Sequence, residues 1–133
     1  MDQLAAGETP LRSAHDIVMA RQVVRRLSQE LRFTLVDQTK MVTAASELAR
    51  NTLIYGGGGN MYWHTLMNGT KRGLRLVFAD QGPGIADLDL ALTDGWTSGT
   101  GLGLGLTGAR RLVNEFDIKT SPAGTRVTIV RWS

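Results

Sequence analysis

The chain has 133 residues, 42% of them hydrophobic, and this length predicts one domain with a single core over residues 1–133. The lack of cysteine excludes a disulfide scaffold, a thiol nucleophile and any cysteine-ligated metal site. Fifteen Lys and Arg against 12 Asp and Glu give a net charge of +3, and because no aromatic side chains are interleaved with the scattered basic pairs, we expect no nucleic-acid binding. No apolar run is long enough to cross a membrane and no secretion signal is recognised, so we expect a cytoplasmic protein without membrane contact.

An amphipathic helix is expected near the start of the chain. Residues 1–8 are typical of a loose end, and residues 11–12 are expected to form a short strand. Ser13 is a typical helix N-cap, with Asp16 three residues after it. Apolar side chains then recur at steps of three and four residues, which predicts a helix over residues 14–32.

A second helix and a hairpin are expected next. The helical pattern begins near Thr34 and continues until four consecutive glycines at residues 56–59 make further helix unfavourable. Residues 61–67 and 74–79 are two extended runs, and the polar segment 68–73 between them is typical of a hairpin turn.

The second half of the chain alternates between turns and regular structure. Turn residues dominate residues 80–107, a long loop for a small domain, and the apolar patch at residues 88–92 is compatible with a brief helix. Helix returns over residues 107–115, and a second hairpin follows with strands at residues 116–120 and 125–132. Neighbouring strands with helices grouped against one face predict an α+β two-layer sandwich with a mostly antiparallel sheet.

Glycine is concentrated in the middle of the chain. Fourteen of the 16 glycines lie between Gly56 and Gly108, and a glycine occupies every second position from residue 99 to residue 105. Packing does not explain this pattern, because each glycine gives up side-chain burial. Successive backbone N–H groups that lead into a helix N-terminus form a site for phosphate oxygens. Neither standard phosphate motif accounts for the segment, because the chain has no Gly-Lys-Ser/Thr triplet and the G-x-G-x-x-G match at residues 103–108 does not follow a strand.

Three polar residues share one face near the end of the second helix. Glu47, Arg50 and Asn51 are spaced i, i+3 and i+4, which places them together and opposite the apolar Leu48. The alternative interpretation is a solvated helix face. The position of the trio, in the last turns before four glycines, favours a functional role.

A second polar group follows the second expected strand. Asp80 is suited to accept a hydrogen bond from an exocyclic amine, and side-chain-free Gly82 and Gly84 would let a flat ring lie against the backbone. An ordinary turn is the alternative, since turns use the same residue types. The late pair Gly124-Thr125 is by itself typical of a hairpin turn.

These segments, taken in order, resemble the motifs of the Bergerat-fold (GHKL) ATPases. Residues 47–51 fit the E-x-x-x-N box of that superfamily, residues 80–84 fit its D-x-G-x-G box, and residues 101–106 fit its G-x-G-L-G-L box. Residues 124–125 fit its late Gly-Thr pair. The resemblance covers nearly the whole chain, and the superfamily's ATP-binding fold agrees with the two-layer sandwich.

Within the superfamily, the chain is similar to the small anti-sigma-factor and switch-protein serine kinases. Residues 16–22, 46–51, 97–99 and 111–116 carry this similarity. It implies a serine/threonine kinase that transfers the γ-phosphate of ATP to a STAS-domain antagonist protein in bacterial stress or sigma-factor signalling. The implied partners are STAS-domain antagonist or scaffold proteins, and a downstream phosphatase or sigma-pathway regulator.

The resemblance also implies roles for individual residues. Glu47 would be the general base toward the acceptor hydroxyl, Arg50 a phosphate or substrate contact, and Asn51 the ligand that holds Mg²⁺ between the phosphates. Asp80 would accept from the adenine amine, and Thr125 would support the same contact. The remaining implied nucleotide-binding positions are Gly82, Gly84, Ile85, Gly99, Thr100, Gly101, Leu102, Gly103, Leu104 and Gly105. The segment between residues 85 and 100 contains no Lys or Arg, so no cation there is available to the γ-phosphate.

Two other functions compete with the kinase. One is a nucleotide-dependent module that sequesters a partner, such as an anti-sigma factor, with little phosphate transfer. The other is the detached catalytic domain of a histidine kinase, which is disfavoured because no helical segment offers a phosphoacceptor His in a dimerising hairpin. For partner contact, the outer face of the first helix carries Arg21, Arg25 and Arg26, and a solvated helix face is the alternative interpretation.

Overall fold

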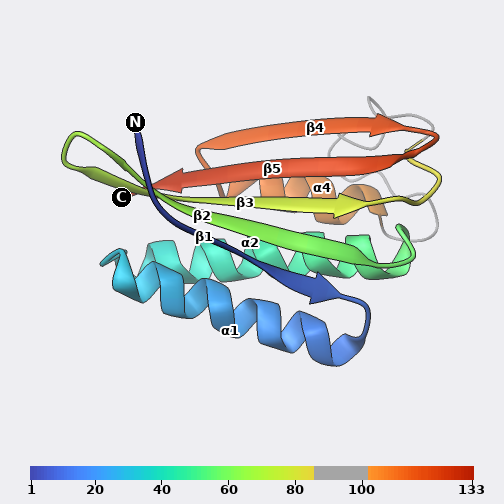
Figure 1. Cartoon of the computed structure of the whole chain (residues 1–133), viewed down its shortest axis with the longest axis horizontal. Coiled ribbons are helices and arrows are strands. Elements are labelled where there is room, and N and C mark those ends of the chain that lie inside the picture. The colour runs from blue at the N-terminus through green and yellow to red at the C-terminus, as the bar shows by residue number, and fades with distance from the viewer. Residues whose placement is uncertain (86–101) are drawn as a thin grey trace.

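A computed structural model describes residues 1–85 and 102–133, with only the backbone described at residues 102–105. Within these residues, five antiparallel strands form one sheet in the order β1-β2-β3-β5-β4. The strands are β1 (Asp2–Leu11), β2 (Gly59–Asn68), β3 (Lys71–Asp80), β4 (Glu115–Ser121) and β5 (Gly124–Trp132), and the helices are α1 (Ala14–Glu30), α2 (Leu35–Ile54) and α4 (Leu102–Arg111). All three helices lie on one face of the sheet (Figure 1). The expected α+β two-layer sandwich is therefore confirmed.

The core lies between the sheet and this helical layer. Leu76 of β3 and Ile129 of β5 pack in one buried cluster with Leu27 of α1 and Leu48 of α2. Alternate residues of a strand face the same side, so each strand directs one set of side chains into this cluster. Helix α2 occupies the middle of the helical layer and contacts both α1 and α4. None of the described helices combines the length and apolar character needed to cross a bilayer.

The first helix begins where the sequence predicts and ends earlier. The Ser13 hydroxyl accepts a hydrogen bond from the Asp16 backbone N–H at 3.2 Å, which confirms it as the N-cap of α1. The helix ends at Glu30 rather than at residue 32, because Arg32 adopts a left-handed backbone with φ 61°. Thr34 then caps α2 in the same way, by accepting from the Asp37 N–H at 3.2 Å.

The expected loose N-terminus is wrong. Residues 2–11 form β1, which pairs with β2 from Asp2 opposite Met67 to Leu11 opposite Gly59. This strand is at the edge of the sheet and most of its residues are exposed, so its sequence lacks the apolar alternation by which strands are recognised. The edge position also accommodates Pro10, which has no N–H to donate to a neighbour.

The first hairpin is longer and tighter than expected. Its strands extend to Asn68 and Lys71, which pair with each other and leave a two-residue turn rather than the expected segment 68–73. Gly69 in this turn has φ 64°, a conformation that glycine adopts without strain.

Helix α4 differs most from expectation. It begins at Leu102 rather than at residue 107 and ends at Arg111 rather than at residue 115. Residues 102–105 therefore form a helical turn and not part of an extended glycine loop. The brief helix expected at residues 88–92 lies outside the described residues.

The strand register sets the position of the functional groups. Asp80, the last residue of β3, is opposite Gly59 on β2 and Thr125 on β5. The C-terminal end of α2 reaches this same end of the sheet through the glycines that lead into β2. The motifs at residues 47–51 and 80–84 are thereby brought beside the last Gly-Thr pair.

Candidate functional site

A narrow cavity of about 40 Å³ lies between the end of α2 and the ends of β3 and β5. Five residues that the sequence singled out line it, namely Asn51, Asp80, Gly84, Ile85 and Thr125. They come from three separate segments of the chain, which the strand register and the packing of α2 bring together.

The cavity has apolar walls, and of the residues that form them only Leu106 is a defined position of a motif identified in the sequence. These walls are formed by Leu48, Phe78, Leu106 and Val127. Phe78 and Val127 are each two residues from a polar site residue on the same strand, so alternation points them to the same face. This two-residue spacing in the sequence could have identified Phe78 and Val127 as part of the site. A slot with apolar sides and a carboxylate at its edge suits a flat heteroaromatic ring with an N–H group.

The Asp80 carboxylate is held by the backbone on one side only. Its Oδ1 accepts hydrogen bonds from the N–H of Gly82 at 2.9 Å and the N–H of Thr125 at 3.2 Å. Within the described residues Oδ2 has no hydrogen-bond partner. The carboxylate is therefore fixed in direction while one oxygen remains able to accept from a ligand.

Glycine is required around Asp80 by close approach of the backbone. A Cβ on Gly56 would overlap the Asp80 carboxylate, and a Cβ on Gly82 would lie 2.8 Å from the Gly56 Cα. Gly84 has φ 80°, and a Cβ there would overlap the Ser121 carbonyl oxygen. The space beside Gly82 is thus filled by Gly56, which corrects the expectation that Gly82 leaves room for a ring. Gly84, by contrast, lines the cavity.

Two threonines and one backbone amide fix the far side of the slot. The hydroxyls of Thr120 and Thr125 are 2.9 Å apart, and Thr120 Oγ1 also accepts from the Ile85 N–H at 2.9 Å. This chain of hydrogen bonds ties the segment after β3 to both strands of the second hairpin. Thr120 was missed by sequence reasoning, since only its alternation with Ile118 on β4 marks it as facing the helices.

The polar trio of α2 is arranged differently from expectation. Asn51 lines the cavity, but Leu48 lines it too, and Glu47 and Arg50 do not. At 3.6 residues per turn Asn51 lies about 40° from Glu47 and about 60° from Leu48 around the helix axis. Asn51 is therefore at the border between the polar face and the core, and the expectation that Leu48 faces away from it is wrong. Glu47 is half-buried, and Arg50 is exposed.

The Asn51 side chain has an unused hydrogen-bonding group in a buried position. Its Nδ2 is inaccessible to solvent and has no partner among the described residues. An unsatisfied buried amide is costly unless something outside the described residues bonds to it. Because the amide oxygen and nitrogen are assigned by their surroundings, either atom can point in this direction. One side-chain carbonyl, completed by phosphate oxygens and water, is a ligand set that Mg²⁺ accepts, so the residues present fit that ion.

The glycine-rich segment is described only in part. Gly99, Thr100 and Gly101 lie outside the described residues, and residues 102–105 form the first turn of α4. The first turn of an α-helix has backbone N–H groups without partners inside the helix, and the helix dipole favours anions there. Leu106, one turn further, lines the cavity. The start of α4 therefore lies beside the slot.

Comparison with protein families matches residues 10–131 to the family described as Histidine kinase-like ATPase domain. The chain is also 42% identical over 118 residues to Serine/threonine-protein kinase RsbT of Bacillus subtilis (strain 168). That similarity covers 88% of this chain and 89% of the relative.

Two crystal structures have a similar fold. The first contains the RsbU and RsbW domains of a protein from Mycobacterium tuberculosis, with a TM-score of 0.63 at 17% identity. The match covers 96% of this chain and 32% of the other, so this chain spans about a third of that length. The second is the SiaB-SiaC complex from Pseudomonas aeruginosa, with a TM-score of 0.54 at 12% identity over 98% of this chain and 91% of the other.

Proposed function

This chain belongs to the histidine kinase-like ATPase domain family, and on that premise we propose that it is an ATP-dependent serine/threonine-protein kinase. The observation that carries the proposal is the 42% identity to a serine/threonine-protein kinase over 89% of that kinase's length. The polar groups around the narrow cavity support it. The proposed acceptor is a STAS-domain antagonist protein, and phosphorylation of that protein would switch a stress or sigma-factor signalling pathway.

The narrow cavity is the proposed adenine site. Asp80 Oδ2 accepts a hydrogen bond from the exocyclic amine, while Oδ1 remains bonded to two backbone N–H groups. Thr125 supports the same edge of the ring through its hydroxyl, and Gly84 and Ile85 contribute the adjoining wall. At about 40 Å³ the cavity is smaller than the ring, so the proposal requires its walls to move apart on binding, with Leu106 of α4 as the wall nearest the phosphates.

The phosphates extend from this slot toward Asn51 and the first turn of α4. Asn51 is the proposed protein ligand of Mg²⁺, which when bound neutralises phosphate charge. The backbone N–H groups of residues 102–105 are oriented by the helix and donate to phosphate oxygens. Gly99, Thr100 and Gly101 remain proposed phosphate contacts outside the described residues.

The transfer step needs one base on the protein. The Glu47 carboxylate takes the proton of the acceptor hydroxyl as the hydroxyl oxygen bonds to the γ-phosphorus. The bond between that phosphorus and the β–γ bridging oxygen breaks, and ADP leaves. Glu47 lies one helical turn before Asn51, which places the base next to the metal ligand. Exposed Arg50 is the proposed contact to the incoming protein substrate.

Transfer from γ-labelled ATP to candidate STAS-domain proteins, with Mg²⁺ present, tests the proposal. We expect label on a serine or threonine, and we expect Glu47→Gln to bind ATP normally while transfer falls about 10²–10⁴-fold. Glu30→Gln, at an exposed position at the end of α1, is the control and should transfer at the rate of the unmodified protein.

Two results would contradict parts of this assignment. Unchanged transfer in Glu47→Gln removes Glu47 from the mechanism. ATP binding by the unmodified protein without transfer to any STAS-domain protein favours the alternative of a nucleotide-dependent module that sequesters its partner.

A further inference from the structure

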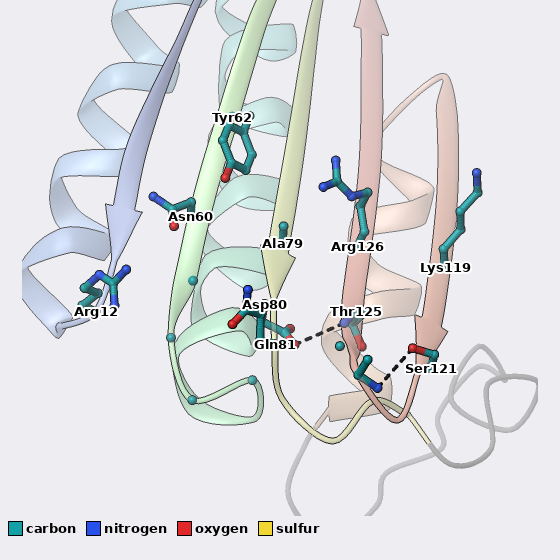
Figure 2. A pocket seen from close by; sticks show the side chains of 16 residues that line it. Arg12, Asn60, Tyr62, Ala79, Asp80, Gln81, Lys119, Ser121, Thr125 and Arg126 are labelled. Carbon is teal, nitrogen blue, oxygen red and sulfur yellow. Dashed lines mark hydrogen bonds between the residues drawn. The ribbon is translucent and has the colours of Figure 1, made fainter.

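A second, larger cavity opens on the opposite face of the sheet. Its volume is about 610 Å³, and it lies at the end of the sheet where β3 and β5 meet the Gly56–Gly59 turn. Figure 2 shows Asn60, Tyr62, Lys119 and Arg126 in front of the strands, with the helices behind them. Gly56, Asp80 and Thr125 line both cavities, so the two adjoin at this end of the sheet, while the larger cavity extends over the face that the helices leave open.

Three cations line the outer cavity. Arg12 lies on one side of it, after β1, and Lys119 and Arg126 lie on the other side, on β4 and β5 (Figure 2). All three side chains are exposed, and within residues 1–85 and 102–133 none has a hydrogen-bond or ion-pair partner. The cavity floor between them contains Asn60 and Tyr62 of β2.

Two of these cations repel each other in the folded chain. Lys119 and Arg126 are directly opposite in the antiparallel pairing of β4 and β5, so both side chains project from the same face. Like charges in this arrangement destabilise a sheet. No hydrogen bond or ion pair to either side chain is present among the described residues, and an anion placed between the two side chains would offset the repulsion.

We propose that this basic pocket, defined by Arg12, Lys119 and Arg126, is a docking site for an acidic segment of a partner protein. Carboxylates of that segment pair with the three cations, and Tyr62 packs against its main chain. Tyr and Arg are residue types enriched in protein interfaces. The inference rests on the proposed function only in assuming that the kinase acts with a partner protein. It assigns recognition to the sheet face opposite the nucleotide slot.

The surroundings of the pocket favour an acidic protein segment over a nucleic acid. Lys119 and Arg126 lie in one row of outward-facing residues across the sheet. The neighbouring row, two residues further along each strand, contains Glu8 on β1 and Asp117 on β4. These carboxylates border the cations and would repel a continuous phosphate backbone. The exposure of the cations also argues against a small anion, which needs a more enclosed site to bind specifically.

The arginines on the outer face of α1 are the competing contact. Arg26 is already paired with Glu30 at 3.1 Å, whereas Arg21 and Arg25 are exposed. Arg21 and Arg25 thus provide a matched pair of cations on α1. They can be compared with Lys119 and Arg126, the pair of cations on the sheet.

The test uses a fluorescein-labelled hexaglutamate peptide and the full chain, with binding read as fluorescence anisotropy at low ionic strength. We expect the double variant Lys119→Glu/Arg126→Glu to weaken peptide binding about 10-fold or more, because two favourable charge contacts become repulsive. The double variant Arg21→Glu/Arg25→Glu makes the same change in net charge on α1 and should alter binding less than about 3-fold. Circular dichroism checks that both variants are folded.

Equal weakening by the two double variants would overturn the proposal, because net charge alone would then explain the binding. The proposal would also be overturned if a short DNA duplex competed with the peptide and bound the sheet variant, Lys119→Glu/Arg126→Glu, more weakly than the unmodified protein. Sedimentation showing that the sheet variant changes only self-association would overturn it too. ATP affinity measured on the sheet variant should be unchanged, so a failure of the nucleotide assignment is separable from a failure of this one.

Discussion

The position of the Asp80 carboxylate depends on residues that have no side chain. Gly56 and Gly82 lie against it and against each other, and the backbone of Gly124 approaches Asp80 so closely that a Cβ would overlap the Asp80 carbonyl oxygen. Three turns of the chain therefore converge on Asp80. Substitutions that add a single methyl group there should act on ligand binding through Asp80.

Gly56→Ala tests this dependence. The added Cβ overlaps the Asp80 carboxylate, which must move and lose one or both of its bonds to the backbone N–H groups. We expect ATP affinity to fall about 10-fold or more, since a hydrogen bond to a charged group contributes about 1.5–3 kcal/mol. Equilibrium binding of a fluorescent ATP analogue measures the change.

Gly108→Ala is the matched control. Gly108 lies in α4, and outside that helix's own backbone no described atom lies within 4 Å of an added Cβ, so alanine should be accommodated. Because alanine favours helix over glycine, we expect the melting temperature to stay equal or rise, with ATP affinity unchanged. Equal ATP affinity in the two alanine variants would contradict the role given to Gly56.

At the scale of elements, one ion pair joins the two layers. Arg131 of β5 donates to Asp37 of α2 at 2.6 Å and to the carbonyl of Leu112, just after α4, at 2.8 Å. The hydrogen bond from the Arg131 guanidinium holds the pKa of the Asp37 carboxyl below its ordinary value, despite partial burial that acts in the opposite direction. Arg131 thus ties α2 and the end of α4, the two helices that flank the narrow cavity, to the sheet.

Asp37 should contribute a pH-dependent part of the stability. Its folded pKa is below its unfolded value near 3.8, so the contribution is present above about pH 4 and is lost as the pH falls through the folded pKa. Asp37→Asn should therefore lower the free energy of unfolding at pH 7 by about 1.5–3 kcal/mol and flatten its decline below pH 4. Urea denaturation between pH 3 and pH 7 measures both, and an unchanged decline would contradict the assignment.

The repulsion between Lys119 and Arg126 on the second hairpin leads to a further prediction. Lys119→Glu places a carboxylate opposite Arg126 and converts a repulsive cross-strand pair into an attractive one. We expect the free energy of unfolding to rise by about 0.2–1 kcal/mol, and the gain to shrink at high salt. Thermal denaturation at low and high salt measures it, and a destabilised variant would show that the two cations do not repel.

The elements differ in how far the sequence could predict them. Helix α2 has an apolar stripe and an N-cap, and the predicted helix agrees with the structure. Strand β1 was missed because an edge strand with exposed side chains has no apolar alternation and is stabilised by pairing with β2. The start of α4 was misplaced because glycine at residues 103 and 105 disfavours helix locally, while packing on α2 supports it.

The site was predictable where its residues recur as a spaced motif. Asp80, Asn51 and Thr125 could be identified together because each belongs to one of four boxes in a fixed order. Thr120 and Gly56 could not, because their role comes from the pairing of β4 with β5 and from the close approach of two turns. Contacts of this kind depend on tertiary register, which local patterns do not encode.

At the scale of the whole molecule, polar groups gather on both faces of the sheet and meet at the ends of β3 and β5, where Asp80 and Thr125 line both cavities. The face covered by helices has the narrow slot with Asp80 and Asn51, and the open face has the basic pocket. β3 and β5 contribute to both, with alternate residues directed to opposite sides. If the narrow cavity holds the nucleotide as proposed, Lys119 and Arg126 would contact the partner protein from the opposite face, with Asp80 and Thr125 at the border between the two cavities.

Calorimetric titration of Mg–ATP into the folded protein, paired with Asp80→Asn, tests the central claim most directly. The account predicts saturable binding at one site, weakened about 10-fold or more in Asp80→Asn, because asparagine has one acceptor oxygen where the proposed contact uses both oxygens of the carboxylate. Absence of binding heat at several temperatures from well-folded protein, or equal affinity in Asp80→Asn, would contradict it.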